Sequence, residues 1–491
     1  MSTTSEWLGV LGRERARPAR VREWPHAWWL AVGTVCFGAF MGQLDASIVT
    51  LIYRSLRVQF HSSLAGVQWV SLSYLLALTA LLIPVGRLAD IHGRKLTYLY
   101  GFVVFTATSA VCGVAPSLGV LIGARVVQAF GAAMLQANSV ALVVTSAPAN
   151  RMRAALGIQA GAQAIGLALG PTLGGLLVST VGWRWVFGIN IPVGVLGVVA
   201  GIYLLPRTRR RAPAAGLDRS GLLLLATATT SLLLGMSVAS GLSLPGWVAI
   251  VLLGLSGAAM VGFVARQRRA AAPLVQLALL RSRAVSAGLL GALCGYLVLF
   301  GPLVLIPVVL TDGGSSELRA GLVLTALPAG FALAAVGVER LLPRSLSDRG
   351  RAALGAAVSI VALAGLLAGP LTTPLNTGWL VALLALLGVG LGTFTPANNT
   401  LVMGAIPARS AATGGGLVSM TRSLGTALGV ALVTLALSLG ASGQHILDGP
   451  RAAVLILAAA AAATLLSAAL TPAASSAASG QGKVGPPDLG L

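Results

Sequence analysis

The chain has 491 residues, of which 56% are hydrophobic and only 9% are charged, and its formal net charge is +21. This composition excludes an ordinary soluble globular protein. The positive charge does not indicate a nucleic-acid partner, because most Lys and Arg residues lie in short segments between long apolar runs. Cys36, Cys112 and Cys294 all fall inside apolar runs, so we expect neither a disulfide framework nor a metal site.

The apolar runs predict an all-α polytopic membrane protein. Most of them exceed about 18 residues, the length of a membrane span. They also lack the alternation of barrel strands, so helices are the remaining way to satisfy the backbone in lipid. In chain order the predicted spans are 28–52, 67–86, 96–114, 118–145, 154–178, 185–205, 220–239, 247–265, 285–310, 320–340, 353–370, 378–402, 411–440 and 451–470.

The basic residues predict the orientation of these spans. Counted from the first span, almost all Lys and Arg residues fall on the side of the two termini, and the excess of Lys and Arg marks the cytoplasmic side. The exceptions on the other side are Arg54, Arg57, Arg184, Arg319 and Arg451. We therefore expect both termini in the cytoplasm. The first apolar run is too long for a signal peptide, and the preference for Arg and Ala is typical of a bacterial, GC-rich genome. We expect the bacterial inner membrane.

An internal repeat divides the chain. Asp348 lies in a short basic segment that repeats the one around Asp90, and Leu424–Gly429 repeats Ile165–Gly170 at nearly the same separation. A duplicated bundle is common among secondary transporters. The repeat predicts a cytoplasmic tail at 1–24, a six-helix bundle at 25–205, a linker with two extra helices at 206–284, a second six-helix bundle at 285–470 and a cytoplasmic tail at 471–491.

Several motifs lie at matching places along these spans. They are Leu44-Asp45-Ala46-Ser47 in the first span, Gly86-x-Leu88-Ala89-Asp90-x-x-Gly93-Arg94-Lys95 between spans 2 and 3, Arg125-Val126-Val127-Gln128 in span 4, Gly166-Leu167-Ala168-Leu169-Gly170-Pro171-Thr172-Leu173-Gly174-Gly175 in span 5, and Gly182-Trp183-Arg184-Trp185 before span 6. With them the chain resembles the major facilitator superfamily, and within it the fourteen-span drug:proton antiporters.

Asp45 and Arg125 are the candidates for proton coupling. Asp45 is the only acidic residue well inside an apolar run, where a carboxylate costs about 2.5–3.5 kcal/mol. Burial disfavours its charged form, so we expect the carboxyl to exchange a proton during transport. The resemblance implies that Arg125 takes part in this step. The alternatives are a structural Asp45 bonded to a neighbouring helix and a static pair between the two residues.

Polar side chains in otherwise apolar spans predict a central substrate cavity. Gln128 and Gln136 continue the polar stripe of Arg125, and Gln159 lies one turn from Gln163. By the repeat, Arg422 corresponds to Gln163. The further candidates are Asn398 and Asn399, although each of these amides alone is more typical of a helix–helix hydrogen bond.

Two motifs are expected to control the motion of the halves. Small residues at every fourth position, Gly166, Gly170 and Gly174, allow close helix contact, and Pro171 and Gly175 complete the motif. The resemblance implies that this motif marks antiporters and seals against proton leak; plain tight packing is the alternative. The loop residues Gly86, Asp90, Gly93, Arg94 and Lys95, with Asp348 in the repeat, are expected to form a cytoplasmic latch rather than a solvated charge cluster, with the basic side chains facing anionic lipid.

The expected function is export of a hydrophobic small molecule, such as an antibiotic or other secondary metabolite, in exchange for protons. The chain has no Gly-x-x-x-x-Gly-Lys-Ser/Thr loop for ATP, no catalytic triad pattern and no cofactor motif, so we expect an ion-driven carrier and no enzyme. The expected partners are the substrate, protons and lipid, and the expected state is a monomer. The alternatives are a proton-linked importer and a non-transporting receptor of the same fold.

Overall fold

The computed structural model describes residues 14, 16–148, 151–208, 218–239, 244–270, 273–274, 277–341, 343, 346–369, 377–406, 411–441 and 448–471. Within these ranges every regular element is a helix, and fourteen helical stretches are long and apolar enough to cross a membrane. The predicted all-α polytopic fold with fourteen spans is therefore confirmed. Most of the two predicted tails lies outside the described residues.

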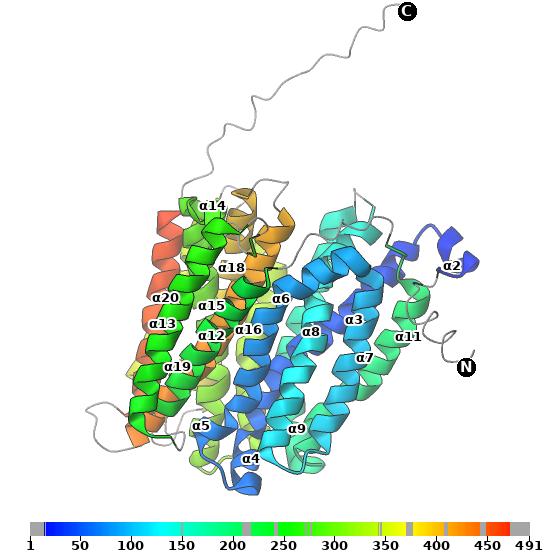
Figure 1. Ribbon diagram of the computed structural model, residues 1–491. Coiled ribbons are helices and arrows are strands. Elements are labelled where there is room, and N and C mark those ends of the chain that lie inside the picture. Colours follow the sequence, from blue (N-terminus) through cyan, green and yellow to red (C-terminus); the bar gives the residue numbers. More distant parts are fainter. Residues whose placement is uncertain are drawn as a thin grey trace, which may run out of the picture.

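The first half of the chain forms one group of long helices, at the right of Figure 1. Within it α3 packs against α9 and α11, while α8 packs against α6 and α7. The helices are α3 (Ala27–Ile48), α6 (Trp69–His92), α7 (Arg94–Gly113), α8 (Leu118–Ser146), α9 (Met152–Thr180) and α11 (Asn190–Leu204), with the short elements α2 (Ala19–Glu23), η1 (Val49–Ile52), α4 (Tyr53–Phe60), α5 (Leu64–Val67) and α10 (Arg184–Gly188).

The second half forms the other group. Here α18 packs against α16 and α17, and α15 packs against α19 and α20. The helices are α15 (Arg283–Asp312), α16 (Glu317–Leu341), α17 (Asp348–Ala368), α18 (Thr377–Gly404), α19 (Ala411–Ala441) and α20 (Gly449–Leu470), preceded by α12 (Arg219–Ala239), α13 (Gly246–Arg269) and the short α14 (Leu277–Leu280). The helices α12 and α13 form a hairpin of their own, and α12 also contacts α6 and α19.

Local sequence signals set the ends of several helices. Gly93 separates α6 from α7 with φ 115°, a backbone region that favours glycine. The hydroxyl of Ser117 accepts a hydrogen bond from the Val120 amide at the start of α8, and Ser347 does the same for Gly350 at the start of α17. These caps satisfy amides that have no partner within the helix.

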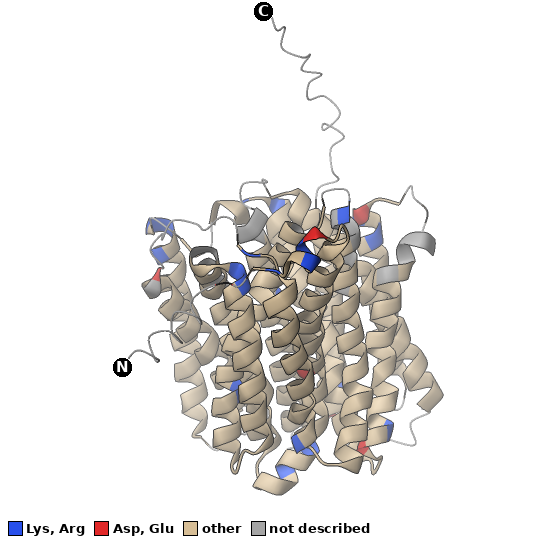
Figure 2. Ribbon diagram, turned by 90° about the vertical axis from the view of Figure 1, so that its right-hand side faces the viewer, with Lys and Arg blue, Asp and Glu red and all other residues tan. Residues whose placement is uncertain are grey.

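Charged residues collect at the ends of the bundle (Figure 2). We call the end that carries α2, the α6–α7 connection at Gly93 and α14 the basic face, and the opposite end, with α4 and α5, the α4 face (Figure 1). The described basic residues of the basic face outnumber those of the α4 face, which are Arg54, Arg57, Arg184, Arg319 and Arg451.

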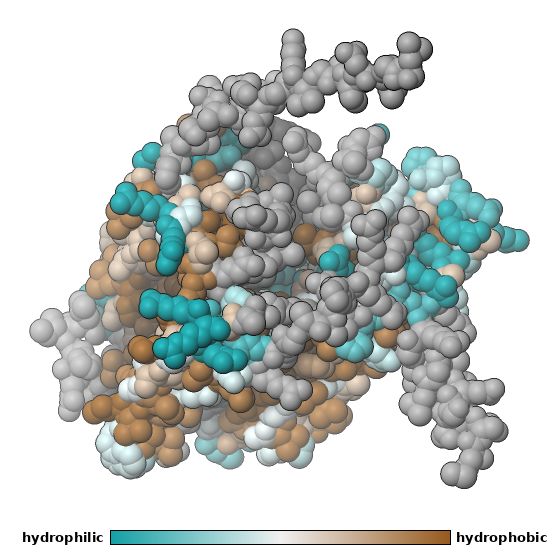
Figure 3. Space-filling model, turned by 45° about the horizontal axis from the view of Figure 1, so that its top comes forward, coloured by the Kyte–Doolittle hydropathy of each residue, from teal (hydrophilic) through white to brown (hydrophobic). Residues whose placement is uncertain are grey.

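The flank of the molecule between these ends is apolar, as expected of a surface in contact with lipid (Figure 3). The hairpin illustrates this: on α13 the side chains of Trp247, Ile250 and Val261 are 65%, 75% and 71% exposed. In water such an apolar surface would promote aggregation, whereas in a bilayer it is the surface that contacts lipid.

The two halves touch along α9–α16 and along α6–α19. The α9–α16 contact is close because glycines remove the side chains: a methyl group on Gly175 would lie 2.7 Å from the Glu317 carbonyl oxygen, and one on Gly321 would collide with the Pro171 carbonyl. The hydroxyls of Thr172 and Thr325 hydrogen-bond across this contact. Arg54 also forms an ion pair with Glu317, at 3.7 Å. The halves are thus in contact toward the α4 face.

Candidate functional site: a buried ion pair beside a central cavity

An ion pair between Asp45 and Arg125 lies inside the first bundle. A guanidinium nitrogen of Arg125 on α8 donates to Asp45 Oδ2 on α3 at 2.6 Å. Asp45 is 0% exposed and Arg125 is 1% exposed. Removing one partner of such a pair leaves a buried charge, so the two residues stabilise each other.

Other helices complete the coordination of both charges. Asn190, at the start of α11, donates its amide to Asp45 Oδ1 at 3.0 Å. The side-chain oxygen of Gln128 accepts from Arg125 at 2.6 Å, and the Gln128 amide donates to Ser109 at 2.7 Å. The Arg125 Nε also donates to the Val70 carbonyl of α6 at 2.9 Å. The ionised pair is well satisfied in this conformation.

Aromatic rings enclose the guanidinium. The Arg125 Cζ lies 4.1 Å from the centre of the Tyr74 ring and 5.7 Å from that of Phe187. Such cation–π contacts strengthen when the cation is shielded from water. The Tyr74 hydroxyl is buried and has no hydrogen-bond partner among the described residues. Tyr74 therefore meets Arg125 through its ring alone.

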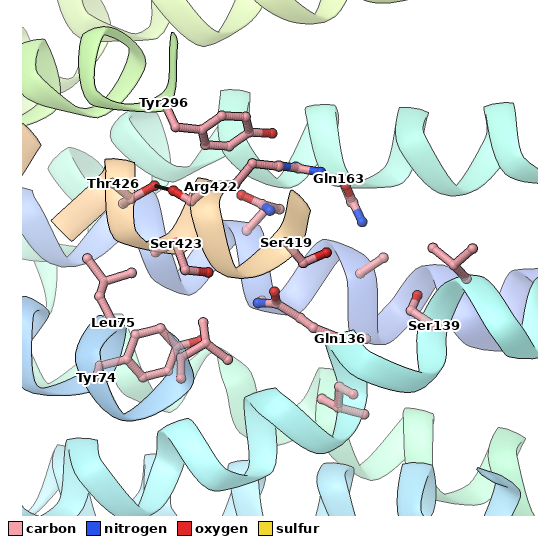
Figure 4. A pocket seen from close by; sticks show the side chains of 18 of the residues that line it. Tyr74, Leu75, Gln136, Ser139, Gln163, Tyr296, Ser419, Arg422, Ser423 and Thr426 are labelled. Carbon is pink, nitrogen blue, oxygen red and sulfur yellow. Dashed lines mark hydrogen bonds between the residues drawn. The ribbon is translucent and has the colours of Figure 1, made fainter. Parts of the chain in front are cut away.

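A cavity lies between the two halves, next to this pair (Figure 4). Its empty space is about 830 Å³, including the part that is open to solvent. Tyr74 and Ala46 line it, whereas Asp45 and Arg125 do not. The lining residues come from α3, α6, α8, α9, α15 and α19, and the polar ones are Gln43, Tyr74, Gln136, Ser139, Gln159, Gln163, Tyr296, Ser419, Arg422, Ser423 and Thr426.

The order of residues along the helices places the cavity relative to the two faces. On α9 the lining residues Gln159 and Gln163 lie closer to the basic face than Pro171 and Gly175, which contact α16. On α8, which runs the other way, Arg125 lies nearer the α4 face than the lining residue Gln136. The ion pair and the α9–α16 contact between the halves thus both lie on the α4 side of the cavity.

The span-5 motif contacts both halves with different residues. A methyl group on Gly166 or Gly170 would collide with α3, at the Phe40 carbonyl or the Ser47 side chain, and one on Gly174 would lie 2.8 Å from Ile48. The other side of the motif, formed by Pro171 and Gly175, contacts α16. One stretch of α9 therefore connects the helix that carries Asp45 to the second half of the molecule.

The loop motif between α6 and α7 is fixed from within the first bundle. The buried Lys95 ammonium donates to the carbonyls of Ile202 and Leu205, each at 2.8 Å, at the end of α11. Thr208 accepts from the Arg94 amide at 3.0 Å and donates to Glu14 at 2.9 Å. Lys95 therefore does not face lipid as expected, because helix-end carbonyls take up its ammonium.

Two further latch residues, Gly86 and Asp348, lie within helices. Gly86 lies within α6, where a methyl group would only touch Ala137, at 3.6 Å. Asp348 lies in the first turn of α17, behind the Ser347 cap. The side chain of Asp90 lies outside the described residues, and its part in the latch stays a prediction.

Comparison with known proteins identifies the family. The sequence model of the Major Facilitator Superfamily matches residues 35–430. The chain is a member of the major facilitator superfamily. This agrees with the paired bundles and the cavity between them, and it establishes a transporter family rather than an enzyme family.

Named relatives of this major facilitator protein are exporters and other transporters. It is 32% identical to the tetracenomycin C resistance and export protein of Streptomyces glaucescens, over 84% of this chain and 76% of that protein. It is 31% identical to the riboflavin transporter RibZ of Clostridioides difficile, over 82% and 87%, and 32% identical to a probable actinorhodin transporter of Streptomyces coelicolor, over 82% and 72%.

Solved structures share the fold at low sequence identity. A bacterial homologue of the human lysosomal transporter Spinster, in an inward-facing and unoccupied conformation, aligns with a TM-score of 0.60 at 16% identity, over 91% of this chain and 98% of that one. An auto-inhibited peptide transporter of the POT family gives 0.62 at 18%, over 91% and 96%. The predicted major facilitator fold is therefore confirmed.

The cavity brings together some of the predicted residues of this facilitator and leaves others out. Gln136, Gln159, Gln163 and Arg422 all line it. Gln128 belongs instead to the ion-pair network. Asn398 and Asn399, on α18, lie outside the lining as well, and Asn398 donates to the Gly288 carbonyl of α15 at 2.8 Å, which is the helix–helix bond weighed as its alternative role.

Sequence reasoning gave no role to Asn190, Tyr74 or Tyr296. Asn190 carried a signal, because an amide inside an apolar run must find a hydrogen-bond partner. The two tyrosines carried none, since aromatic rings are common anywhere in membrane helices. Among the described residues no group of three or more His, Cys, Asp or Glu side chains could hold a metal ion.

Proposed function

We propose that this facilitator exports a hydrophobic small molecule in exchange for protons, by alternating access. The observation that carries the proposal is the buried Asp45–Arg125 pair beside the cavity, with Tyr74 shared between them. A titratable carboxyl inside a membrane bundle is energetically costly, and such residues typically mark a functional site.

The geometry supports a coupled cycle. Protonation of Asp45 cancels the negative partner of Arg125 and leaves a buried cation that must find new contacts. Asp45 is on α3, which packs against the glycine row of α9, and α9 also contacts α16 of the other half. A change in the ion pair can therefore be transmitted to the contact that closes the α4 face. Release of the proton would restore the pair.

Charge distribution supports the orientation. The excess of Lys and Arg on the basic face favours the cytoplasmic side for that face, and with it for both termini, in the bacterial inner membrane. The cavity would then load from the cytoplasm and release on the outside. Both bundles and the whole cavity belong to one chain, which supports a monomer.

The name of one relative bears on the direction of transport. The tetracenomycin C protein is named for resistance and export, which favours an exporter. The riboflavin transporter leaves an importer as the second candidate. The span-5 motif favours the exporter through the resemblance to the antiporters.

Transport in everted membrane vesicles tests the proposal. A panel of hydrophobic antibiotics is offered outside, and an acidic vesicle interior supplies the proton gradient. We expect gradient-driven accumulation of at least one compound by the native chain, loss of it with an uncoupler, and loss of it in Asp45→Asn. The control, Asp448→Asn, removes an exposed carboxylate of the α4 face and should behave as the native chain.

Three results would contradict the proposal. Full proton-driven accumulation by Asp45→Asn would remove the carboxyl from the mechanism. Gradient-driven loss of compound from the vesicles, instead of accumulation, would indicate an importer. Absence of any proton-linked movement across the panel, with the protein correctly inserted, would favour the receptor alternative.

A further inference from the structure

The charge of the cavity is one-sided. Among the described residues, its lining contains the guanidinium of Arg422 and no Asp or Glu side chain. Asp45 is next in sequence to the lining residue Ala46. Its carboxylate is fully buried, however, and already paired with Arg125. A bound molecule therefore meets a positive group without a negative one.

Arg422 is available to a ligand in a way that Arg125 is not. Arg125 is enclosed and satisfied by Asp45, Gln128 and the Val70 carbonyl. Arg422 has its Cζ 4.4 Å from the centre of the Tyr296 ring, and it forms no ion pair with the part of the chain that the structure describes. The ring fixes the guanidinium in place and leaves its N–H donors free to bind an anion.

The neighbours of Arg422 are neutral donors and flat apolar surfaces. Ser419 and Ser423 lie on the same helix, and Gln163 of α9 lines the same cavity (Figure 4). The rings of Tyr74, Tyr296 and Phe300 supply aromatic wall. Hydroxyls and amides can support a carboxylate that Arg422 binds, whereas nothing in the lining offers a counter-charge to a cation.

We propose that the cavity selects aromatic molecules that carry one acidic group, with the anion bound by Arg422 and the ring system stacked along Tyr74, Tyr296 and Phe300. The inference rests on the proposed function, since it names the substrate class of the same cavity.

Equilibrium binding with matched probes tests the inference without transport. The purified full chain is placed in phosphatidylcholine nanodiscs, and protein-free discs correct for partition into lipid. The probes are anthraquinone-2-carboxylate, its neutral carboxamide and the cationic 2-aminomethyl analogue, at pH 7. We expect the carboxylate to bind about tenfold tighter than the carboxamide. We expect the cation to bind more weakly than either.

Variants of Arg422 separate charge from packing. Arg422→Gln should bind carboxylate and carboxamide equally, with its affinity for the carboxamide unchanged. Arg422→Lys should keep a preference for the carboxylate, since it keeps the charge. Arg451→Gln, a change at an exposed arginine of the α4 face, should bind as the native chain does. A thermal unfolding profile of Arg422→Gln that matches that of the native chain shows that the variant is folded.

The outcomes distinguish this inference from the proposed function. Equal binding of carboxylate and carboxamide by the native chain, or an unchanged preference in Arg422→Gln, overturns the inference even if protons drive export of the neutral probe. A carboxylate preference that Arg422→Gln abolishes supports it even if vesicles show no proton coupling, in which case the proposed function fails alone.

Discussion

The Tyr74 ring lies 4.1 Å from the Arg125 guanidinium on one side and lines the cavity on the other. It is therefore a direct physical link between the place where a substrate would bind and the charge that balances Asp45. A substrate that displaces this ring removes part of what stabilises the buried cation.

The first prediction concerns that link. Tyr74→Ala should lower proton flux per transported molecule about tenfold, because a shielded cation–π contact contributes up to about 2 kcal/mol. Tyr74→Phe should couple normally, since the hydroxyl has no partner among the described residues. An internal pH dye in proteoliposomes measures proton flux, and equal coupling in Tyr74→Ala would exclude the link.

The ion pair predicts a non-additive effect on stability. Arg125→Met leaves the Asp45 carboxylate buried without its cation, and breaking such a pair costs about 3–5 kcal/mol. Adding Asp45→Asn should recover most of this loss. The thermal unfolding midpoints of the native chain, both single variants and the double variant test it in one detergent. A double variant less stable than either single variant would contradict the prediction.

The contact at Thr172 and Thr325 predicts a reversible lock. Their hydroxyls hydrogen-bond across the two halves, so cysteine sulfur atoms at these two positions would lie within reach of each other. Thr172→Cys/Thr325→Cys should form a crosslink under oxidation and stop transport, and dithiothreitol should restore it. Each single cysteine variant is the control. Normal transport by the fully crosslinked chain would show that the halves need not separate here.

The α9–α16 contact predicts an effect of size alone. Gly175→Ala places a methyl group against the Glu317 carbonyl, and such overpacking costs about 1–3 kcal/mol. We expect the state that is open at the α4 face to gain population, seen as faster thiol labelling of a cysteine at position 172. Gly161→Ala, on the same helix with open space around it, is the matched control. Equal labelling in both variants would contradict the prediction.

Asp218 predicts a pH dependence at the basic face. Burial disfavours its charged form, but hydrogen bonds from the Gly221 amide, Arg266 and Gln267 outweigh this and lower the pKa of the carboxyl. A depressed pKa in the folded state means that the stabilisation is complete above the unfolded value, about 4, and is lost as pH falls through the folded value.

The measurement compares Asp218→Asn with the native chain. At pH 7 the variant should unfold at a lower temperature than the native chain. Its free energy of unfolding should be lower by roughly 1 kcal/mol, since the Arg266 partner is exposed. The difference should shrink as the pH is lowered below about 4. A difference that stays constant with pH would mean that the carboxylate charge contributes nothing to the anchoring of the α12–α13 hairpin.

The membrane path of this chain could be predicted from sequence because the apolar runs are long, and because charge, which is costly in lipid, is almost confined to the segments between them. Asp45 and Arg125 stood out for the same reason. Their pairing was one of the alternatives, since sequence separation does not show which helices face each other. Lys95 differed from expectation because the end of α11 supplies carbonyls that only the fold brings near.

The contents of the cavity were less predictable. Gln163 was found as a polar residue one turn from Gln159, Arg422 was found through the repeat, and both line the cavity. Tyr296 could not be found, because a tyrosine among Leu and Val residues is ordinary in any membrane helix. Asn398 takes the alternative role weighed for it, that of a polar residue at mid-span whose amide connects α18 to α15.

The α12–α13 hairpin makes the molecule lopsided. It is attached next to α6 and α19, where Gln68 and Trp69 both donate to Ser237, so it covers one of the two junctions between the halves. Among the described helices, no corresponding hairpin covers the junction at α9 and α16. The two junctions between the halves therefore meet the bilayer differently, the α6–α19 junction behind the hairpin and the α9–α16 junction directly.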